Sequence, residues 1–279
     1  MNDIEFYGNR YQILQSFPLP QLTTHRDIRI FLPESYYQSD IRYPVLYMHD
    51  GQNLFDKTLA FGSAVWNIPA AVDTFFPGLR YEGVIIIGID NASSQGKFNR
   101  MDEYSPWPRN QHFSLPGWDP DVDYSGGKGA LYIDFIVNNL KNYIDNNYRT
   151  LRDRSHTAIA GSSMGAYISL FAAMLRHDVF SKVGVFSPAL WFNESAMLNF
   201  IQQSNILEHL TVYLDIGTQE TSGLRADFPE VYITGAEKLC SILRNKQNIT
   251  VDYHLWGGDT HCESAWAKRF PEMLKLFYM

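Results

Sequence analysis

Residues 157–166 constrain the fold more than any other stretch, because an apolar run there ends in the pattern Gly-x-Ser-x-Gly at residues 161–165. The apolar run predicts a strand, and residues 166–176 predict a helix directly after it. A serine between two such elements lies on a turn too sharp for most residues, and its hydroxyl projects away from the sheet. Gly161 and Gly165 have no Cβ, so the strand and the helix can pass close to that turn. The sequence therefore predicts strand, tight turn and helix, with Ser163 at the tip.

Strands and helices alternate through most of the remaining chain, which predicts an α/β fold around a mostly parallel sheet with helices on both faces. Apolar runs at 44–48, 83–89, 157–160, 183–186, 211–216 and 250–256 predict its strands. Helical patterns cover 64–72, 132–148, 231–244 and 264–276, with an irregular helical region at 188–203. Alternating apolar residues at 11–17 and 26–32, punctuated by prolines, predict antiparallel strands at the N-terminal edge of the sheet.

Residues 90–129 lack any such periodicity. A run of this length without secondary structure inside a compact domain is usually functional. We interpret it as a loop excursion over the end of the sheet that carries Ser163. No internal repeat or linker is evident, so we expect one domain over residues 1–279.

Composition and charge exclude several classes of partner. The net charge is −7 with a pI of about 5.6, and Lys and Arg form no cluster. Nucleic acid and anionic membrane surfaces are therefore not expected partners. The first residues lack the basic and apolar regions of a signal peptide, and no apolar run reaches the length of a membrane span. A cytoplasmic protein is expected, and its two cysteines suggest no disulfide framework.

A serine hydroxyl becomes a good nucleophile only when a base takes its proton and an acid orients that base. On a strand–turn–helix of this kind the three follow along the chain in the order Ser, Asp or Glu, His. Four histidines lie downstream of Ser163. His177 is at a helix end, His209 is in a polar connector, and His254 is inside a strand. His261, in a Gly-rich stretch after the last strand, is the expected base.

The acid is expected after the strand at 211–216. Glu220 lies just beyond Gly217, where its side chain can reach back toward His261, and it is our first choice. Asp215, inside the apolar run, and Asp227 remain alternatives. Asp259 is too close in sequence to His261 to be preferred.

Two backbone N–H groups are expected to stabilise an oxyanion, that of Met164 after the serine and that of Gln52 after an earlier strand. His49 and Asp50 are interpreted as structural residues that close this strand. No metal site is expected, because the pairs 49/50 and 261/263 each lack a third ligand at a sensible spacing. No phosphate-binding loop is present either, and no cofactor is expected.

Several motifs in a consistent order resemble one family. They lie at residues 26–33, 43–55, 103–106, 161–165, 217–220 and 261–266. From residue 26 to the C-terminus the chain resembles the esterase family of α/β-hydrolases that includes esterase D, feruloyl esterase domains and enterochelin-type siderophore esterases. Many members have glycine after the second glycine of the motif, where this chain has Ala166.

The resemblance implies the α/β-hydrolase fold and a serine esterase acting on a small-molecule ester through an acyl-enzyme. It implies Ser163 as the nucleophile, His261 as the base and Glu220 as the acid, with an oxyanion hole formed by the backbones of Gln52 and Met164. An acyltransferase with the same acyl-enzyme, or a catalytically silent binding protein on the same fold, remains an alternative.

The substrate is the least constrained feature. The aromatic residues of the 90–129 loop suggest a small, aromatic or siderophore-type ester. Trp66, Arg100 and Tyr104 are the expected substrate-binding residues. Arg100 and Arg109 either meet an anionic group such as a catecholate or are simply solvated. No oligomeric state follows from the sequence.

Overall fold

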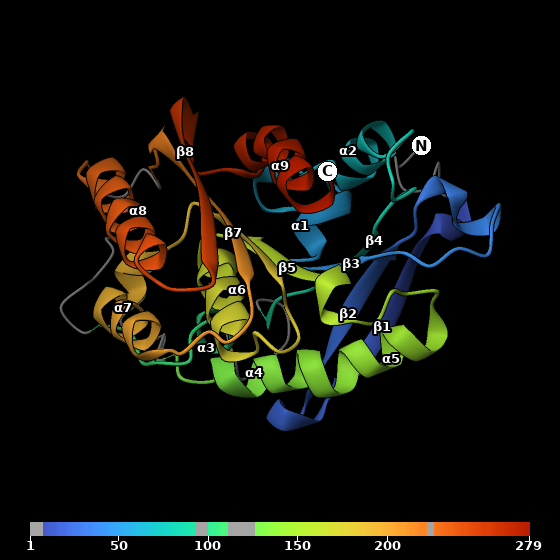
Figure 1. The fold of residues 1–279 in the computed structure, drawn as a ribbon, viewed down its shortest axis with the longest axis horizontal. Coiled ribbons are helices and arrows are strands. Elements are labelled where there is room, and N and C mark those ends of the chain that lie inside the picture. Colours follow the sequence, from blue (N-terminus) through green and yellow to red (C-terminus); the bar gives the residue numbers. More distant parts are fainter. Residues whose placement is uncertain (1–7, 93–99, 111–125, 222–225) are drawn as a thin grey trace.

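In the computed structural model residues 8–92, 100–110, 126–221 and 226–279 are described, and an eight-stranded sheet lies at their centre (Figure 1). The strand order is β1-β2-β4-β3-β5-β6-β7-β8. The strands are β1 (Tyr11–Leu19), β2 (Thr24–Phe31), β3 (Val45–His49), β4 (Ile85–Ile89), β5 (Thr157–Ser162), β6 (Lys182–Phe186), β7 (Leu210–Gln219) and β8 (Ile249–Thr260). The longer helices are α2 (Ile68–Phe75), α6 (Met164–Leu175), α7 (Glu194–Gln203), α8 (Phe228–Arg244) and α9 (Glu263–Tyr278), and the short ones are α1 (Gln52–Phe55), α3 (Arg100–Glu103), α4 (Gly129–Phe135) and α5 (Lys141–Asn147).

The structure confirms the predicted, mostly parallel sheet and its antiparallel N-terminal edge. Strands β3 to β8 are parallel to one another. Strand β2 lies antiparallel to both of its neighbours, β1 and β4. Every residue of β3, β4 and β5 is buried, as expected of strands covered on both faces. Because the carboxyl ends of parallel strands meet at one edge, the turns after β3, β5, β7 and β8 converge there.

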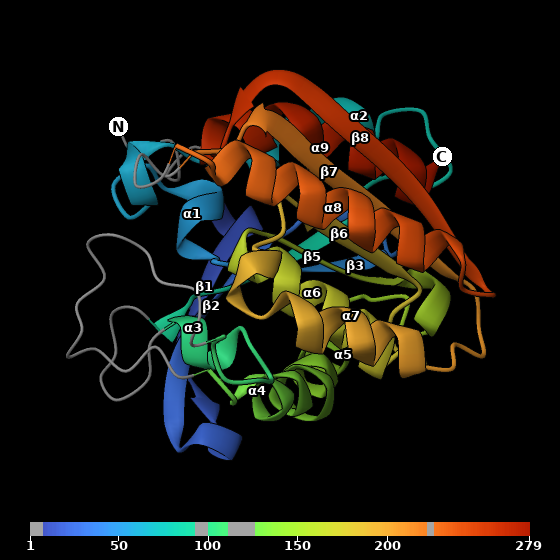
Figure 2. The same ribbon diagram turned by 90° about the vertical axis from the view of Figure 1, so that its left-hand side faces the viewer.

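Successive residues of these strands point to opposite faces of the sheet and pack in two separate hydrophobic clusters. Tyr47 and Ile159 pack with α4, α6 and α8 in one cluster. Leu46 and Ala158 face the opposite way and pack with α2 and α9. Helix α8 runs along β7 and β8 (Figure 2), so both faces carry helices. Within the described part of the chain, no helix has the length and apolarity that crossing a membrane requires.

Several element boundaries differ from the sequence expectation, and the helix expected at 64–72 lies at Ile68–Phe75. The helix expected at 132–148 begins at Gly129 and contains a π-helical turn at Ile136–Leu140. Strand β8 continues to Thr260, through the Gly-Gly stretch expected to be a loop, because its pairing with β7 resumes after a register shift near Gly217. The 90–129 region contains the helical turn α3, and its residues 93–99 and 111–125 lie outside the described residues.

A buried ion pair anchors α3 to the sheet. The guanidinium of Arg26 on β2 donates to the carboxylate of Glu103, and both side chains are at most 1% exposed. Burial raises the pKa of Glu103, and the charge of Arg26 opposes that shift. Arg26 thereby holds one end of the short helix whose first residue is Arg100.

We expect Arg26→Met to lower the free energy of unfolding by about 3–5 kcal/mol, because it leaves the Glu103 carboxylate buried without its charged partner. Urea unfolding followed by circular dichroism measures the change. The matched control is Lys238→Met, which breaks a pair with Glu194 whose lysine is 53% exposed and should cost less than about 1 kcal/mol. Equal stabilities of the two variants would contradict this role for Arg26.

Candidate active site

Ser163 lies at the turn between β5 and α6, in a backbone conformation that few residues adopt. Its φ and ψ are 56° and −122°, and its N–H donates to the Phe186 carbonyl oxygen at 2.9 Å. A Cβ on Gly161 would lie 2.7 Å from the carbonyl carbon of Gly165, so a side chain there would push strand and helix apart. The expected strand–turn–helix is thus present, and the glycine at 161 is needed for the close approach.

His261 and Glu220 meet at the ends of the adjacent strands β7 and β8. The His261 Nδ1 lies 2.7 Å from Glu220 Oε2, and the Glu220 side chain is completely buried. Burial alone would raise the pKa of Glu220, but the hydrogen bond and charge of His261 outweigh it and hold that pKa below its usual value. An ionised carboxylate only accepts hydrogen bonds, so Nδ1 carries the proton and Nε2 is left to act as a base.

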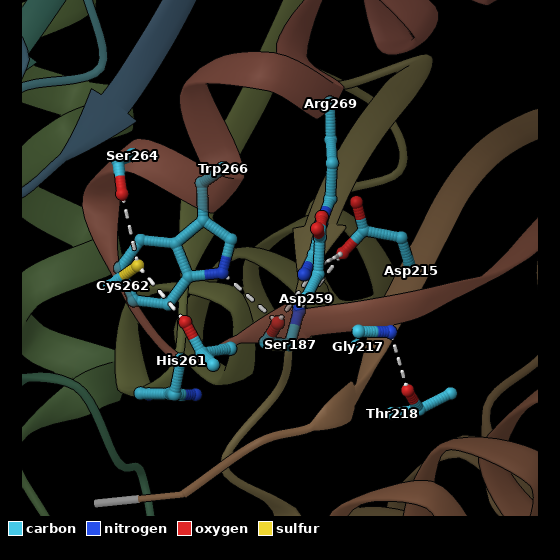
Figure 3. A network of polar contacts seen from close by, with 12 residues as sticks. Ser187, Asp215, Gly217, Thr218, Asp259, His261, Cys262, Ser264, Trp266 and Arg269 are labelled. Carbon is cyan, nitrogen blue, oxygen red and sulfur yellow. Dashed lines mark hydrogen bonds and ion pairs between the residues drawn. The ribbon is translucent and has the colours of Figure 1, made fainter.

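The second oxygen of Glu220 is fixed by two further donors. The Ser187 hydroxyl donates to Oε1 at 2.5 Å, and the Gly217 N–H donates to the same oxygen at 2.7 Å. Ser187 Oγ in turn accepts from the indole N–H of Trp266 at 3.0 Å and from Arg269 Nη1 at 3.2 Å. Figure 3 shows Trp266 and Arg269 both directed at Ser187. These contacts fix the orientation of the carboxylate, so Oε2 faces His261.

The alternative acids lie elsewhere. Asp215 is buried on β7, where its carboxylate accepts from Arg269 Nη1 at 3.2 Å and from the Tyr213 hydroxyl at 3.0 Å. Asp259 accepts from Arg269 Nε at 2.9 Å. Asp227 is exposed at the start of α8. Of the candidate acids it is Glu220 that the structure brings against the imidazole.

Two aromatic side chains enclose the imidazole. The ring of Tyr232, on α8, lies 4.9 Å from that of His261 between centroids, and burial raises the pKa of its hydroxyl. The indole of Trp266 lies edge-on at 4.9 Å from the same ring. Sequence reasoning did not identify Tyr232 or Ser187. Trp266 lies in the motif at residues 261–266, which does not by itself assign it a role. Ser187 has one available signal, its position directly after an apolar strand.

The expected oxyanion donors begin two helices at the same edge of the sheet. Gln52 is the first residue of α1 after β3, and Met164 is the first residue of α6 after the adjacent strand β5. The first N–H groups of a helix have no partner within it, so both can donate to a ligand. A Cβ on Gly51 would lie 2.7 Å from the backbone of Gly88, which explains the glycine before Gln52.

Ser163 and His261 line one pocket of about 790 Å³ at this edge. The other lining residues are Asp27, Arg29, Asp50, Gln52, Asn53, Leu59, Phe61, Asp90, Asn91, Arg100, Met101, Ser162, Glu263 and Trp266. A cavity of this size can enclose a substantial part of a small-molecule substrate.

The three expected substrate-binding residues occupy different environments. Arg100 lines the pocket, where it forms a bidentate ion pair with Asp50, both N–H···O distances being 2.7 Å. Tyr104 is fully buried, and its hydroxyl accepts from the Asp50 N–H at 3.0 Å. Trp66 is 3% exposed and packs against Trp266 at 5.8 Å in the core beneath α2 and α9. Of these three side chains, Arg100 is the one in the wall of the pocket.

The pair His49–Asp50 closes β3, as interpreted from the sequence. His49 Nδ1 lies 3.0 Å from the Tyr132 hydroxyl, and burial lowers the pKa of His49 to about 3, so this ring is neutral. Burial would raise the pKa of Asp50, but the charge of Arg100 more than compensates and that pKa lies below its usual value. Asp50 therefore carries a negative charge in the pocket wall.

Comparisons with known proteins identify the family and the fold of this chain. The sequence model of the family described as "Putative esterase" matches residues 20–277. YbbA of Bacillus subtilis (strain 168), an uncharacterized protein, is 28% identical over 197 residues, which cover 70% of this chain and 69% of YbbA.

Solved structures show the same fold. The IroE-like serine hydrolase from Shewanella oneidensis gives a TM-score of 0.74 at 21% identity, covering 96% of this chain and 80% of that protein. A CE1 ferulic acid esterase from Anaeromyces mucronatus, solved in complex with ferulic acid, gives 0.64 at 21% identity, with 96% and 91% covered. Since the family model extends from the residue after β1 into α9 and so matches most of the chain, the chain belongs to this family of esterases.

Proposed function

We propose that this protein is a serine carboxylic ester hydrolase that cleaves a small-molecule ester through an acyl-enzyme. The observation that carries the proposal is the 2.7 Å contact between His261 Nδ1 and Glu220 Oε2 in the wall of the pocket that also contains Ser163. A buried carboxylate fixed by three donors, an imidazole fixed by that carboxylate and a serine on a strained turn are the parts that acyl transfer needs.

In the first half of the reaction the Ser163 oxygen attacks the ester carbonyl carbon while His261 Nε2 takes the hydroxyl proton. The carbonyl π electrons move onto oxygen, and the backbone N–H groups of Gln52 and Met164 donate to this oxyanion. When the tetrahedral intermediate collapses, the bond to the alcohol oxygen breaks. His261 Nε2 then gives its proton to that oxygen, and the acyl group stays on Ser163.

In the second half a water molecule takes the place of the alcohol. His261 removes a proton from the water as its oxygen attacks the acyl carbon, and the same two N–H groups bind the second oxyanion. The Ser163 oxygen leaves with the proton from His261, which releases the acid. Glu220 stays ionised throughout and stabilises the imidazolium in both halves.

Tyr232 and Trp266 restrict the imidazole to the orientation in which Nδ1 meets Glu220. Their rings contact His261 at 4.9 Å each, and neither carries a charge that would compete with Glu220 for Nδ1. Holding the base in place reduces the entropy that must be lost to reach the transition state.

Small and aromatic esters are the proposed substrates. The pocket volume of about 790 Å³ accommodates an aryl acyl group, and one protein of similar fold was solved with ferulic acid bound. The structure of the 93–99 and 111–125 segments lies outside the described residues, so the proposal rests on the walls formed by β2, α1, α3 and α9.

We expect Ser163→Ala to abolish both p-nitrophenyl acetate hydrolysis above background and covalent labelling by a fluorophosphonate probe, because the attacking oxygen is gone. Intact mass spectrometry measures the labelling. The matched control is Ser162→Ala, which removes the neighbouring hydroxyl and should still be labelled. Labelling of Ser163→Ala at another serine would overturn the assignment, and no labelling of the wild type would favour a catalytically silent protein.

We expect Glu220→Gln to lower kcat by on the order of 10³–10⁴, because an amide cannot stabilise the imidazolium and can stabilise the wrong tautomer of His261. Asp215→Asn changes a carboxylate of equal burial that contacts Arg269 rather than His261, and kcat should fall by less than about tenfold. Steady-state kinetics on folded variants checks both. Losses of the same size would contradict the choice of Glu220 as the acid.

A further inference from the structure

The charged groups that line the catalytic pocket do not balance. Four of the described lining residues carry carboxylates and two carry guanidinium groups. A pocket that binds anionic substrates normally presents cations whose hydrogen-bond donors are available to the substrate. The question is therefore whether either arginine has donors to offer.

Both arginines are committed to carboxylates of the protein. Arg29 donates from Nε and Nη2 to the two oxygens of Asp90, each at 2.7 Å, and from Nη1 to the Tyr11 hydroxyl at 2.9 Å. Arg100 makes the corresponding bidentate pair with Asp50. The charge of each guanidinium is therefore balanced by a carboxylate, and an anionic substrate that approaches the remaining N–H groups also meets that carboxylate.

The other two carboxylates have no cationic partner among the residues that the structure describes. None of the ion pairs between described residues includes Asp27 or Glu263. Asp27 accepts from the Ser16 N–H at 2.8 Å, and Glu263 accepts from the Asn53 amide at 3.1 Å. Burial raises the pKa of Glu263 to about 7, with the charge of Asp50 acting in the same direction and that of Arg100 opposing it. The described wall of the pocket therefore has an excess of negative charge, to which Glu263 contributes fully only above a pH of about 7.

The mouth of the pocket offers an apolar surface instead. Phe61 is 80% exposed and Leu59 is 52% exposed, and both line the pocket. The Phe61 N–H donates to the Asn53 side chain at 3.1 Å, which fixes Phe61 beside helix α1. A phenyl ring held in water at the rim of a catalytic cavity is a favourable contact for an apolar group of a ligand.

We propose that the pocket selects esters whose acyl group is apolar and uncharged, bound against Phe61 and Leu59, and disfavours esters that carry a carboxylate, sulfate or phosphate. This inference rests on the proposed esterase function and narrows its substrate class. It favours neutral aryl esters over the anionic, siderophore-type esters that the sequence left open, because Arg100 is paired with Asp50.

A pair of isosteric substrates tests the selection by charge. The p-nitrophenyl ester of 4-isopropylbenzoic acid and the mono-p-nitrophenyl ester of terephthalic acid differ by an isopropyl group against a carboxylate of similar shape. At low ionic strength kcat/KM should favour the neutral ester at least about tenfold. Repulsion between the substrate carboxylate and one carboxylate of the pocket wall, some 10 Å apart at an effective dielectric constant of about 20, is worth about that factor. Each rate is divided by that of alkaline hydrolysis of the same ester.

Charge-removing variants identify the origin of the selection. Asp27→Asn and Glu263→Gln keep the oxygen that accepts each hydrogen bond, and together they should lower the neutral-to-anionic ratio about tenfold or more. The matched control is Asp178→Asn with Glu208→Gln, which removes two carboxylates, each 59% exposed, near the opposite ends of the strands. The control should keep the wild-type ratio.

A third variant tests the apolar rim. Phe61→Ala should lower the ratio of kcat/KM for the 4-isopropylbenzoate ester to that for p-nitrophenyl acetate by about tenfold, because only the larger acyl group reaches the rim. An unchanged ratio would overturn the assignment of Phe61 to substrate binding.

The remaining outcomes separate this inference from the function on which it rests. If the wild type cleaves p-nitrophenyl acetate but prefers the anionic ester, or if the control lowers the ratio as much as the pocket variants, the substrate class is overturned and the esterase function stands. If the wild type hydrolyses none of the three esters, both are overturned.

Discussion

The buried carboxylate of Glu220 is the group on which the arrangement of the active site depends. An ionised carboxylate with no exposure is costly unless donors surround it. Here the donors come from three neighbouring strand ends: Ser187 after β6, Gly217 on β7 and His261 after β8. Satisfying one charge therefore fixes the relative positions of three loops. Arg269, within α9, also contacts Ser187 and so connects this helix to the network. It forms ion pairs with Asp215 and Asp259 next to Glu220.

Much of this arrangement could be predicted from local sequence. The turn at Ser163 is encoded by a strand, two glycines and a helix within ten residues, and the sheet follows from apolar runs separated by helical periods. Chain order left four histidines as candidate bases, and the position of His261 after the last strand favoured it. The same order favoured Glu220 as the acid, and the structure brings these two side chains together. What local pattern could not supply is the continuation of β8 to Thr260, because that depends on pairing with β7 across a register shift.

The environments of Trp66, Arg100 and Tyr104 show where sequence reasoning ends. An aromatic or basic residue near a catalytic motif has the same local signature whether it faces the ligand or the core. Trp66 is fixed in the core by partners such as Trp266, some 200 positions away, and Tyr104 is fixed by the backbone of Asp50. Ser187 and Tyr232 were missed for the same reason. Their roles arise from contacts with Glu220 and His261 that only the fold creates.

Arg100 stabilises the fold through an ion pair and also lines the pocket. Asp50 lies at the turn after β3 with φ of 55°, directly before Gly51 and Gln52, the latter being the proposed oxyanion donor. Its bidentate pair with Arg100 holds α3 against that turn, and the Arg26–Glu103 pair holds the other end of α3. Because the charge of Arg100 is balanced by Asp50 in this way, the pair offers a substrate anion no net positive charge. Since Arg100 is paired with Asp50, the charge that a substrate meets in the described wall is that of Asp27 and Glu263. Phe61 contacts the apolar part of the substrate.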